Sequence, residues 1–175
     1  RVTLVAFLLK AAVSALKEFP DVNSSLSPPK DALILKRYYN IGVAVDTPDG
    51  LVVPVIRDVD RKGVLELSQE LATVSARMRE GKITPTDISG STFSISSLGG
   101  IGGTTFTPIV NAPEVAILGA VRAKMQPVWD GAAFQPRLML PLCLSYDHRA
   151  VDGALAARFL RKICGALADV RQLVL

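Results

Sequence analysis

The chain has few of the residues that build disulfide frameworks and metal centres. Its 175 residues include two cysteines and one histidine. Two cysteines are too few for a disulfide framework. Cys143 and Cys164 both lie in apolar patterns, which predicts two reduced, buried thiols in a reducing compartment. No second histidine or cysteine stands at ligand spacing from His148, so we expect no metal site.

An excess of one charge and long apolar runs are also missing. The net charge of +4 is small, aromatic residues make up 6%, and no lysine or arginine run stands out. Nucleic acid is therefore not an expected partner. No apolar run approaches the roughly 18 residues that predict a membrane-spanning helix, so a membrane is not an expected partner either. Hydrophobic residues make up 49% of the chain, which is enough for the core of one domain.

Hydrophobic periodicity predicts alternating helices and strands. Apolar residues recur at helical spacing in residues 1–19, 62–82 and 153–175. Strand-like segments rich in Val, Ile and Leu occupy residues 32–47, 51–59, 91–97, 114–121, 126–136 and 137–147. A tight turn at "TPDG" joins the first two of these strands into a hairpin. The pattern predicts an α/β fold, a two-layer sandwich with a mixed β-sheet.

Two polar motifs in the middle of the chain have alternative interpretations. "GGIGG", residues 99–103, follows a strand, but Thr107 and Pro108 stand where a dinucleotide-binding loop would begin a helix. These glycines more simply let the backbone approach a neighbour or a ligand closely. In "SISS", residues 94–97, the hydroxyls either form the polar face of an edge strand or donate to a developing oxyanion. The residues alone favour the edge strand.

The single histidine lies in "LSYDHRAVDG", between a predicted strand and the last helix. A lone histidine is usually structural or simply exposed. At the end of a strand, however, a side chain is both exposed and rigidly held, and Asp152 and Gly153 follow closely at the entry to the helix. A neutral imidazole can take a proton from a thiol or hydroxyl near pH 7. His148 is therefore a candidate general base.

"DHRAVDG" resembles the signature of the dihydrolipoamide acyltransferases, the core components of 2-oxo acid dehydrogenase complexes. The related chloramphenicol acetyltransferases share the spaced His and Asp-Gly. "IGVAVDTPDGLVVPVIRDVD", "FSISSLGGIGGTTFTPIVNAPEVAILG" and "PVWDGAAFQPRLMLPLCLSYDHR" resemble the same family and follow in its usual order, so the resemblance covers essentially the whole chain. "NAPEVAILG" and "MQPVWDG" resemble the bacterial, pyruvate-type branch, which transfers acetyl groups.

The resemblance implies a chloramphenicol-acetyltransferase-like fold and a mechanism of acyl transfer. His148 would deprotonate the thiol of coenzyme A, or that of dihydrolipoamide in the reverse direction. Ser96 would donate a hydrogen bond to the oxyanion of the tetrahedral intermediate. Asp152 would orient the site or support its structure, since the family tolerates asparagine there. Arg149 would be structural.

The resemblance also implies partners and a shared active site. In the family the site lies in a channel between subunits of a trimer, and Phe106, Asn111 and Leu118 match the segment of the channel wall. We expect homotrimers that assemble into a polyhedral core. Coenzyme A would be a substrate, and the lipoyl group would belong to a domain outside this segment. The pyruvate dehydrogenase and dihydrolipoamide dehydrogenase components would bind through other domains.

Residues 1–175 resemble the catalytic domain alone, without a lipoyl or peripheral-subunit-binding domain. The chain begins directly in a helical pattern, so we expect the domain to be N-terminally incomplete. The apolar end "QLVL" packs either on its own domain or at a contact between trimers, and we hypothesise the contact. Alternative functions are a succinyl- or branched-chain acyltransferase on the same fold and a non-catalytic scaffold subunit. The expected location is the cytoplasm of a bacterium, or the mitochondrial matrix of a eukaryote.

Overall fold

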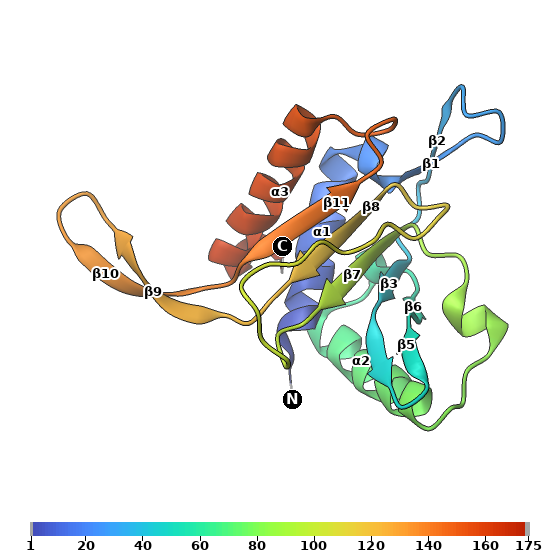
Figure 1. Ribbon diagram of the computed structural model, residues 1–175, viewed down its shortest axis with the longest axis horizontal. Coiled ribbons are helices and arrows are strands. Elements are labelled where there is room, and N and C mark those ends of the chain that lie inside the picture. Colours follow the sequence, from blue (N-terminus) through green and yellow to red (C-terminus); the bar gives the residue numbers. More distant parts are fainter. Residues whose placement is uncertain (1, 174–175) are drawn as a thin grey trace.

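A mixed β-sheet with helices packed on one face forms the body of the computed structural model, which describes residues 2–173 (Figure 1). The α-helices are α1 (Leu4–Glu18), α2 (Val64–Arg79) and α3 (Gly153–Ala168). Short 3-10 helices are η1 (Pro20–Asn23), η2 (Val59–Arg61), η3 (Pro85–Ile88) and η4 (Val170–Leu173). The strands are β1 (Ser24–Leu26), β2 (Leu33–Leu35), β3 (Ile41–Val43), β4 (Val45–Thr47), β5 (Gly50–Val52), β6 (Val55–Ile56), β7 (Phe93–Ser97), β8 (Ala116–Ala120), β9 (Lys124–Trp129), β10 (Phe134–Met139) and β11 (Leu142–Tyr146).

The main sheet has five strands in the order β11-β8-β7-β3-β6. Strand β7 is parallel to both of its neighbours, β3 and β8, whereas β6 and β11 pair antiparallel at the two edges. The prediction of an α/β fold with a mixed sheet is confirmed. The prediction that the serine-rich strand lies at an edge is wrong, because β7 is the central strand and is paired on both sides.

Helix α1 occupies the centre of the helical layer, between α2 and α3 (Figure 1). Its buried residues lie on nearly every side of the helix and include Ala6, Ala11, Ala12 and Ala15, all without exposed surface. Because alanine side chains are small, they let neighbouring helices approach closely. On α3, Phe159 packs edge to face against Phe93 of β7, with 5.7 Å between the ring centroids, and so joins the helical layer to the sheet.

Several predicted segments are divided by the structure. Residues 32–47 form three short strands, β2, β3 and β4, instead of one. The last predicted strand is split between β10 and β11 around Pro141, which has no backbone N–H to continue a ladder. The predicted hairpin at "TPDG" is confirmed, and the hydroxyl of Thr47 donates to the carbonyl of Gly50, 2.6 Å away, across the β4–β5 turn.

The two thiols differ in exposure. Cys143 is partly buried, whereas Cys164 is exposed, so the prediction of two buried thiols is wrong for Cys164. Phe159 and Ile163 are buried on the inward face of α3. Each successive residue of a helix is rotated by about 100°, so Cys164, which follows Ile163, points away from the core.

At the C-terminus, Leu173 is buried against its own domain, and residues 174–175 of the predicted apolar tail lie outside the described residues.

Among residues 2–173, no helix has both the length and the apolar character that crossing a membrane requires.

A buried carboxylate lies where the loop before β8 meets the central strand. Glu114 is 4% exposed, and its Oε1 accepts hydrogen bonds from the hydroxyls of Ser91 and Ser94, the latter at 3.0 Å. Gly42 on β3 makes room for this arrangement, since a Cβ there would lie 2.6 Å from Ser94 Oγ. Burial raises the pKa of Glu114, while the two serine hydroxyls and the charge of Lys36 act in the opposite direction.

The buried Glu114 predicts a pH-dependent stability. Its pKa in the folded state lies above the ordinary value of about 4.3. The stability that protonated Glu114 contributes is therefore full below the ordinary pKa and is lost as pH rises through the raised pKa. Glu114→Gln keeps an oxygen acceptor but cannot ionise. We expect the stability of the wild type relative to Glu114→Gln, measured by urea unfolding, to fall as the pH is raised from about 4 through the raised pKa of Glu114.

The matched control is Glu80→Gln, because the Glu80 side chain is 56% exposed. A difference between wild type and Glu114→Gln that stays constant over this pH range would contradict the prediction.

Candidate active site

Ser96 projects from the sheet face that α1 and α3 do not cover. Side chains alternate along a strand, and Phe93 and Ile95 of β7 belong to the core beneath the helices. Ser96 therefore points to the opposite face. Its neighbour Ser97 points to the other face, where it lines a hollow of about 550 Å³ that α2 and β4 also border. The two hydroxyls therefore lie on opposite faces of the sheet.

Gly119 makes room beside Ser96 for two neighbouring side chains. The strand register places Gly119 of β8 between Ser96 of β7 and Cys143 of β11. A Cβ on Gly119 would lie 2.4 Å from the Cys143 Sγ and 2.9 Å from the ring of Phe106. The Cys143 thiol and the Phe106 ring therefore occupy the space above Gly119, next to Ser96. Of the predicted substrate contacts, Phe106 is the one that the structure brings to Ser96.

The other two predicted substrate contacts lie elsewhere. Leu118 has no exposed surface and belongs to the core under the helices, so in this chain it cannot line an open channel. Because side chains alternate along a strand, the next residue of β8, Gly119, lies on the same face of the sheet as Ser96. Asn111 is exposed in the turn before β8, where its carbonyl accepts the backbone N–H of Glu114. It is at the end of β8 remote from Ser96.

His148 lies in the turn that follows β11, and its side chain is exposed. The residues on either side of it form a bidentate pair, in which Arg149 Nε and Nη2 donate to the two carboxylate oxygens of Asp147 at 2.9 and 2.5 Å. The hydrogen-bonded guanidinium of Arg149 lowers the pKa of Asp147 to about 2. The Asp147 N–H also donates to the carbonyl of Val115 at 2.8 Å. The turn that carries His148 is thus fixed to the sheet, and the charge of Arg149 is paired with that of Asp147.

Tyr146, the last residue of β11, supports the imidazole. The ring centroids of Tyr146 and His148 are 5.6 Å apart, with 47° between the ring planes. Tyr146 packs against the hydrophobic core, and its hydroxyl lies near the start of α3, 3.7 Å from an ideal Cβ on Gly153. The sequence motif pointed to His148 and Asp152 but gave no reason to select Tyr146, because its contact depends on how the chain turns after β11.

Asp152 caps the N-terminus of α3. Its Oδ1 accepts the backbone N–H of Leu155 at 2.8 Å, which satisfies one of the unpaired donors of the first helical turn. This contact fixes the entry of the chain into α3 and agrees with a supporting role.

Ser96 and His148 lie at opposite ends of the sheet within one chain. Ser96 pairs with Gly119 on β8, which pairs with Cys143 near the start of β11. His148 follows Tyr146, which is at the other end of β11. At about 3.3 Å per residue, Tyr146 is already roughly 10 Å farther along the strand than Cys143. A general base and an oxyanion donor must both lie within about 3 Å of the reacting groups. Within one chain, Ser96 and His148 therefore cannot act on the same reacting groups, and each is a candidate half-site.

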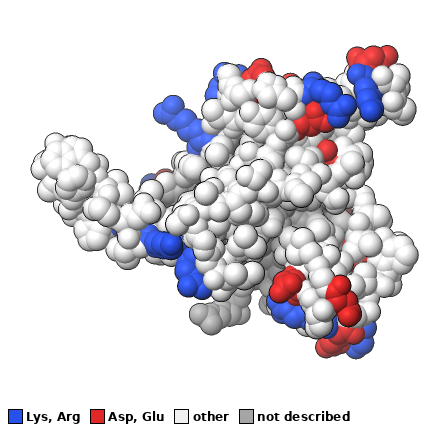
Figure 2. Space-filling view, viewed as in Figure 1, with Lys and Arg blue, Asp and Glu red and all other residues white. Residues whose placement is uncertain are grey.

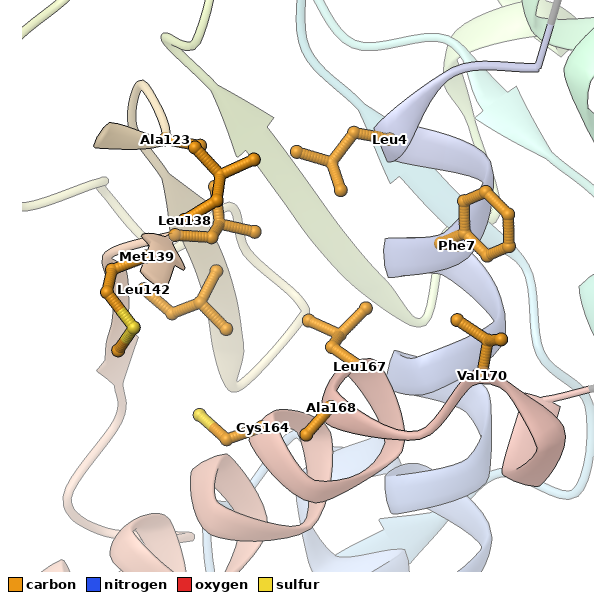
Figure 3. A pocket seen from close by; sticks show the side chains of 11 residues that line it. Leu4, Phe7, Ala123, Leu138, Met139, Leu142, Cys164, Leu167, Ala168 and Val170 are labelled. Atoms are coloured by element: carbon orange, nitrogen blue, oxygen red, sulfur yellow. The ribbon is translucent and has the colours of Figure 1, made fainter. Parts of the chain in front are cut away.

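The apolar groove in Figure 3 lies apart from both half-sites. Its volume is about 400 Å³, and it lies between α1, α3 and the root of the β9–β10 hairpin, with Leu4, Phe7 and Leu167 among its lining side chains. Apart from the thiol of Cys164, whose pKa is raised by burial, its lining side chains are apolar. In the described part of the chain, no cluster of His, Cys, Asp or Glu side chains is arranged to hold a metal ion.

The whole chain, residues 1–175, matches the family model of the 2-oxoacid dehydrogenases acyltransferase (catalytic domain). The chain belongs to this family. It is 61% identical over 175 residues to the dihydrolipoyllysine-residue acetyltransferase component of the pyruvate dehydrogenase complex of Pseudomonas aeruginosa, covering 100% of this chain and 32% of that protein. The same component of Azotobacter vinelandii is 59% identical over 175 residues, covering 100% of this chain and 27% of that protein. The chain thus spans about a third or less of the length of these relatives.

Solved structures of the family have the same fold. Dihydrolipoamide acetyltransferase of Azotobacter vinelandii superimposes with a TM-score of 0.97 at 60% identity, over 99% of this chain and 72% of that one. The cubic core of a pyruvate dehydrogenase multienzyme complex gives a TM-score of 0.98 at 59% identity, over 100% and 72% of the two chains. A chloramphenicol acetyltransferase, 16% identical, has a TM-score of 0.60 over 92% and 76% and shows the shared fold alone.

The contact between Tyr146 and His148 can be tested by NMR, because His148 is the only histidine in residues 1–175. A nearby aromatic ring displaces the imidazole proton signals from their random-coil positions. We expect Tyr146→Leu to remove most of this displacement, and Tyr146→Phe, which keeps a ring, to retain it. Imidazole signals that are the same in all three proteins would contradict the contact.

The helix cap predicts the effect of replacing Asp152. Asp152→Ala removes the acceptor for the Leu155 N–H and should lower the free energy of unfolding by about 1 kcal/mol. Asp152→Asn keeps a capping oxygen and should change it by only a few tenths of a kcal/mol. Thermal unfolding of the three proteins measures the difference. An alanine variant as stable as wild type would exclude the cap as a source of stability.

Proposed function

We propose that the protein transfers an acetyl group between dihydrolipoamide and coenzyme A within the core of a pyruvate dehydrogenase complex. The observation that carries the proposal is the pair of half-sites, with a hydroxyl on the open sheet face and an imidazole on a fixed turn. The relatives at 61% and 59% identity are acetyltransferase components of such complexes, which favours acetyl over succinyl or branched-chain groups.

His148 acts as the general base in the proposed reaction. It takes the proton from the attacking thiol, and the resulting thiolate adds to the carbonyl carbon of the acyl thioester. The Ser96 hydroxyl donates to the oxyanion that forms, and hydrogen bonds of this kind are a large source of rate enhancement. When the intermediate collapses, the carbon–sulfur bond to the other thiol breaks and the leaving thiolate recovers the proton from His148. A thiol with an ordinary pKa of about 8.5 is mostly protonated near pH 7, so a positioned base is needed.

The related Azotobacter vinelandii enzyme provides support for these assignments. A serine, a histidine and an asparagine have been investigated for their role in its catalytic mechanism. Their separations along that chain are the same as those of Ser96, His148 and Asp152. The third position differs, since this chain has an aspartate. Both side chains offer an oxygen that can cap a helix, so the difference is compatible with a supporting role for Asp152.

The separation of the half-sites supports an active site shared between copies. Ser96 of one chain would meet His148 of the next, and a contact between two different surfaces repeats from chain to chain until the ring closes. We propose a homotrimer that assembles into a polyhedral core, as expected from the sequence. Coenzyme A would be a substrate, and the lipoyl group would reach the site from a domain outside residues 1–175. The other enzyme components would bind elsewhere in the full protein.

The direct test is acetyl transfer from acetyl-CoA to dihydrolipoamide by the purified protein. His148→Ala should lower turnover by about 10²–10⁴ and Ser96→Ala by about 10²–10³. The matched control for Ser96 is Ser97→Ala, the adjacent hydroxyl on the other face, which should retain activity. Turnover within a few-fold of wild type in His148→Ala would make the assignment of the base wrong. A panel of acyl thioesters distinguishes acetyl from succinyl and branched-chain transfer.

The shared site predicts complementation between inactive variants. In mixed oligomers of Ser96→Ala and His148→Ala chains, some contacts combine an intact Ser96 from one chain with an intact His148 from another. We therefore expect activity well above that of either variant alone after the two are co-expressed or dissociated and reassembled together. Mixed oligomers that are as inactive as the separate variants would contradict a site built from two chains.

A further inference from the structure

Glu114 is the only acidic or basic side chain among the buried residues of the described chain, residues 2–173. Its Oε1 accepts hydrogen bonds from the hydroxyls of Ser91 and Ser94, whereas its Oε2 is buried without a hydrogen-bond partner among the described residues. Figure 2, which looks onto the open face of the sheet, shows most charged side chains at the margins of the molecule and few over the main sheet. A buried carboxyl group with an unpaired oxygen lowers stability, and groups of this kind gather at functional sites.

The loop before β8 is held to the rest of the chain through this carboxyl group. Among the described hydrogen bonds of residues 104–114, those that reach outside the loop are the two from Ser91 and Ser94 to Glu114. Ser94 lies on β7, two residues before Ser96 and on the same face of the sheet. Glu114 thus fixes the loop to the strand that carries Ser96.

The His148 turn is attached to the end of the same loop. The Asp147 N–H donates to the carbonyl of Val115, the residue that follows Glu114, at 2.8 Å. The other hydrogen bonds of residues 147–151 in the described chain close the turn on itself. The one hydrogen bond that leaves the turn therefore ends beside Glu114.

The position of the imidazole depends on how firmly this end of the loop is held. A segment with few hydrogen bonds to the rest of a protein opens locally at a low free-energy cost. Without an acceptor at Glu114, the Val115 carbonyl would no longer be fixed relative to β7. A general base must lie within about 3 Å of the proton that it takes, and a displacement of about 1 Å can lower a rate about 10²-fold.

We propose that Glu114 is a positioning residue for His148, because its carboxyl group ties the attachment point of the His148 turn to Ser91 and Ser94. The inference rests on the proposed function, in which His148 is the base, and adds a residue that acts through His148 without touching the reacting groups. It also explains why this buried position carries a polar acceptor, since an apolar side chain would leave both serine hydroxyls without one.

Removal of the acceptor tests the role of Glu114 in the full protein. Glu114→Leu has a similar size but cannot accept a hydrogen bond. We expect its turnover in acetyl transfer, per folded protein, to fall by about 10–10²-fold, while the KM for coenzyme A stays within about threefold of wild type. Glu114→Gln keeps an acceptor oxygen and should restore turnover to within about threefold of wild type.

The control for lost stability alone is Ile163→Val, a change in the buried core. Ile163 lies roughly 16 Å along α3 from Asp152, so this variant leaves the His148 turn in place. It should keep wild-type turnover. Circular dichroism gives the folded fraction of each variant.

Double substitutions separate the positioning of His148 from a general loss of structure. In the His148→Ala background there is no base to place, so Glu114→Leu should lower the residual turnover by less than about threefold. In the Ser96→Ala background, where His148 is intact, the loss caused by Glu114→Leu should remain. A merely structural role predicts the same loss in wild type and in both backgrounds.

Ser94→Ala reaches the same contact from β7 and serves as the second variant if Glu114→Leu does not fold. It removes one of the two donors, so we expect a loss of about threefold to tenfold in turnover where His148 is intact and none in the His148→Ala background.

The positioning role would be overturned by folded variants of Glu114 and Ser94 with wild-type turnover, or by losses that persist in the His148→Ala background. Wild-type protein without acetyl transfer would overturn both this inference and the proposed function. An active wild type with unaffected variants would overturn this inference alone.

Discussion

The hydrogen-bonded register of β7, β8 and β11 is the constraint on which the rest of the site depends. It places Ser96, Gly119 and Cys143 in one row and carries Tyr146 to the far end of β11. A shift by one residue would turn Ser96 into the core and Ile95 out of it. The same register holds the root of the β9–β10 hairpin at the Ser96 end and the turn with His148 at the other. The chain therefore carries one candidate half-site at each end of the sheet.

The groups around the two half-sites are held in different ways. His148 is exposed, but its turn is fixed by the pairing of Asp147 with Arg149, by the ring of Tyr146 and by the cap that Asp152 gives to α3. Around Ser96, the fixing is steric. Gly119 leaves room that the Cys143 thiol and the Phe106 ring fill, so any larger residue there would displace both. A rigidly held imidazole and fixed surroundings of the Ser96 hydroxyl suit a reaction that depends on positioning.

Much of the architecture could be predicted from local patterns. The three long helices follow from apolar residues at helical spacing, and the "TPDG" hairpin from its turn residues. Local patterns did not show that β7 is central, because an alternation of serine with apolar residues fits any strand with two different faces. They also did not show that Leu118 lies in the core and Gly119 on the open face, since one residue of register decides between them.

Residue types and their spacing along the chain already identify the groups available for chemistry: one imidazole, a hydroxyl on a strand, and an acidic residue before a helix. These depend on residue type and on short spacing, which a linear chain displays directly. The separation of Ser96 from His148, the position of Phe106 beside Ser96, and the exposed apolar face of the β9–β10 hairpin become visible in the folded chain alone. These features come from strand pairing between residues far apart in the sequence, and local side-chain preferences do not encode the order in which strands pair.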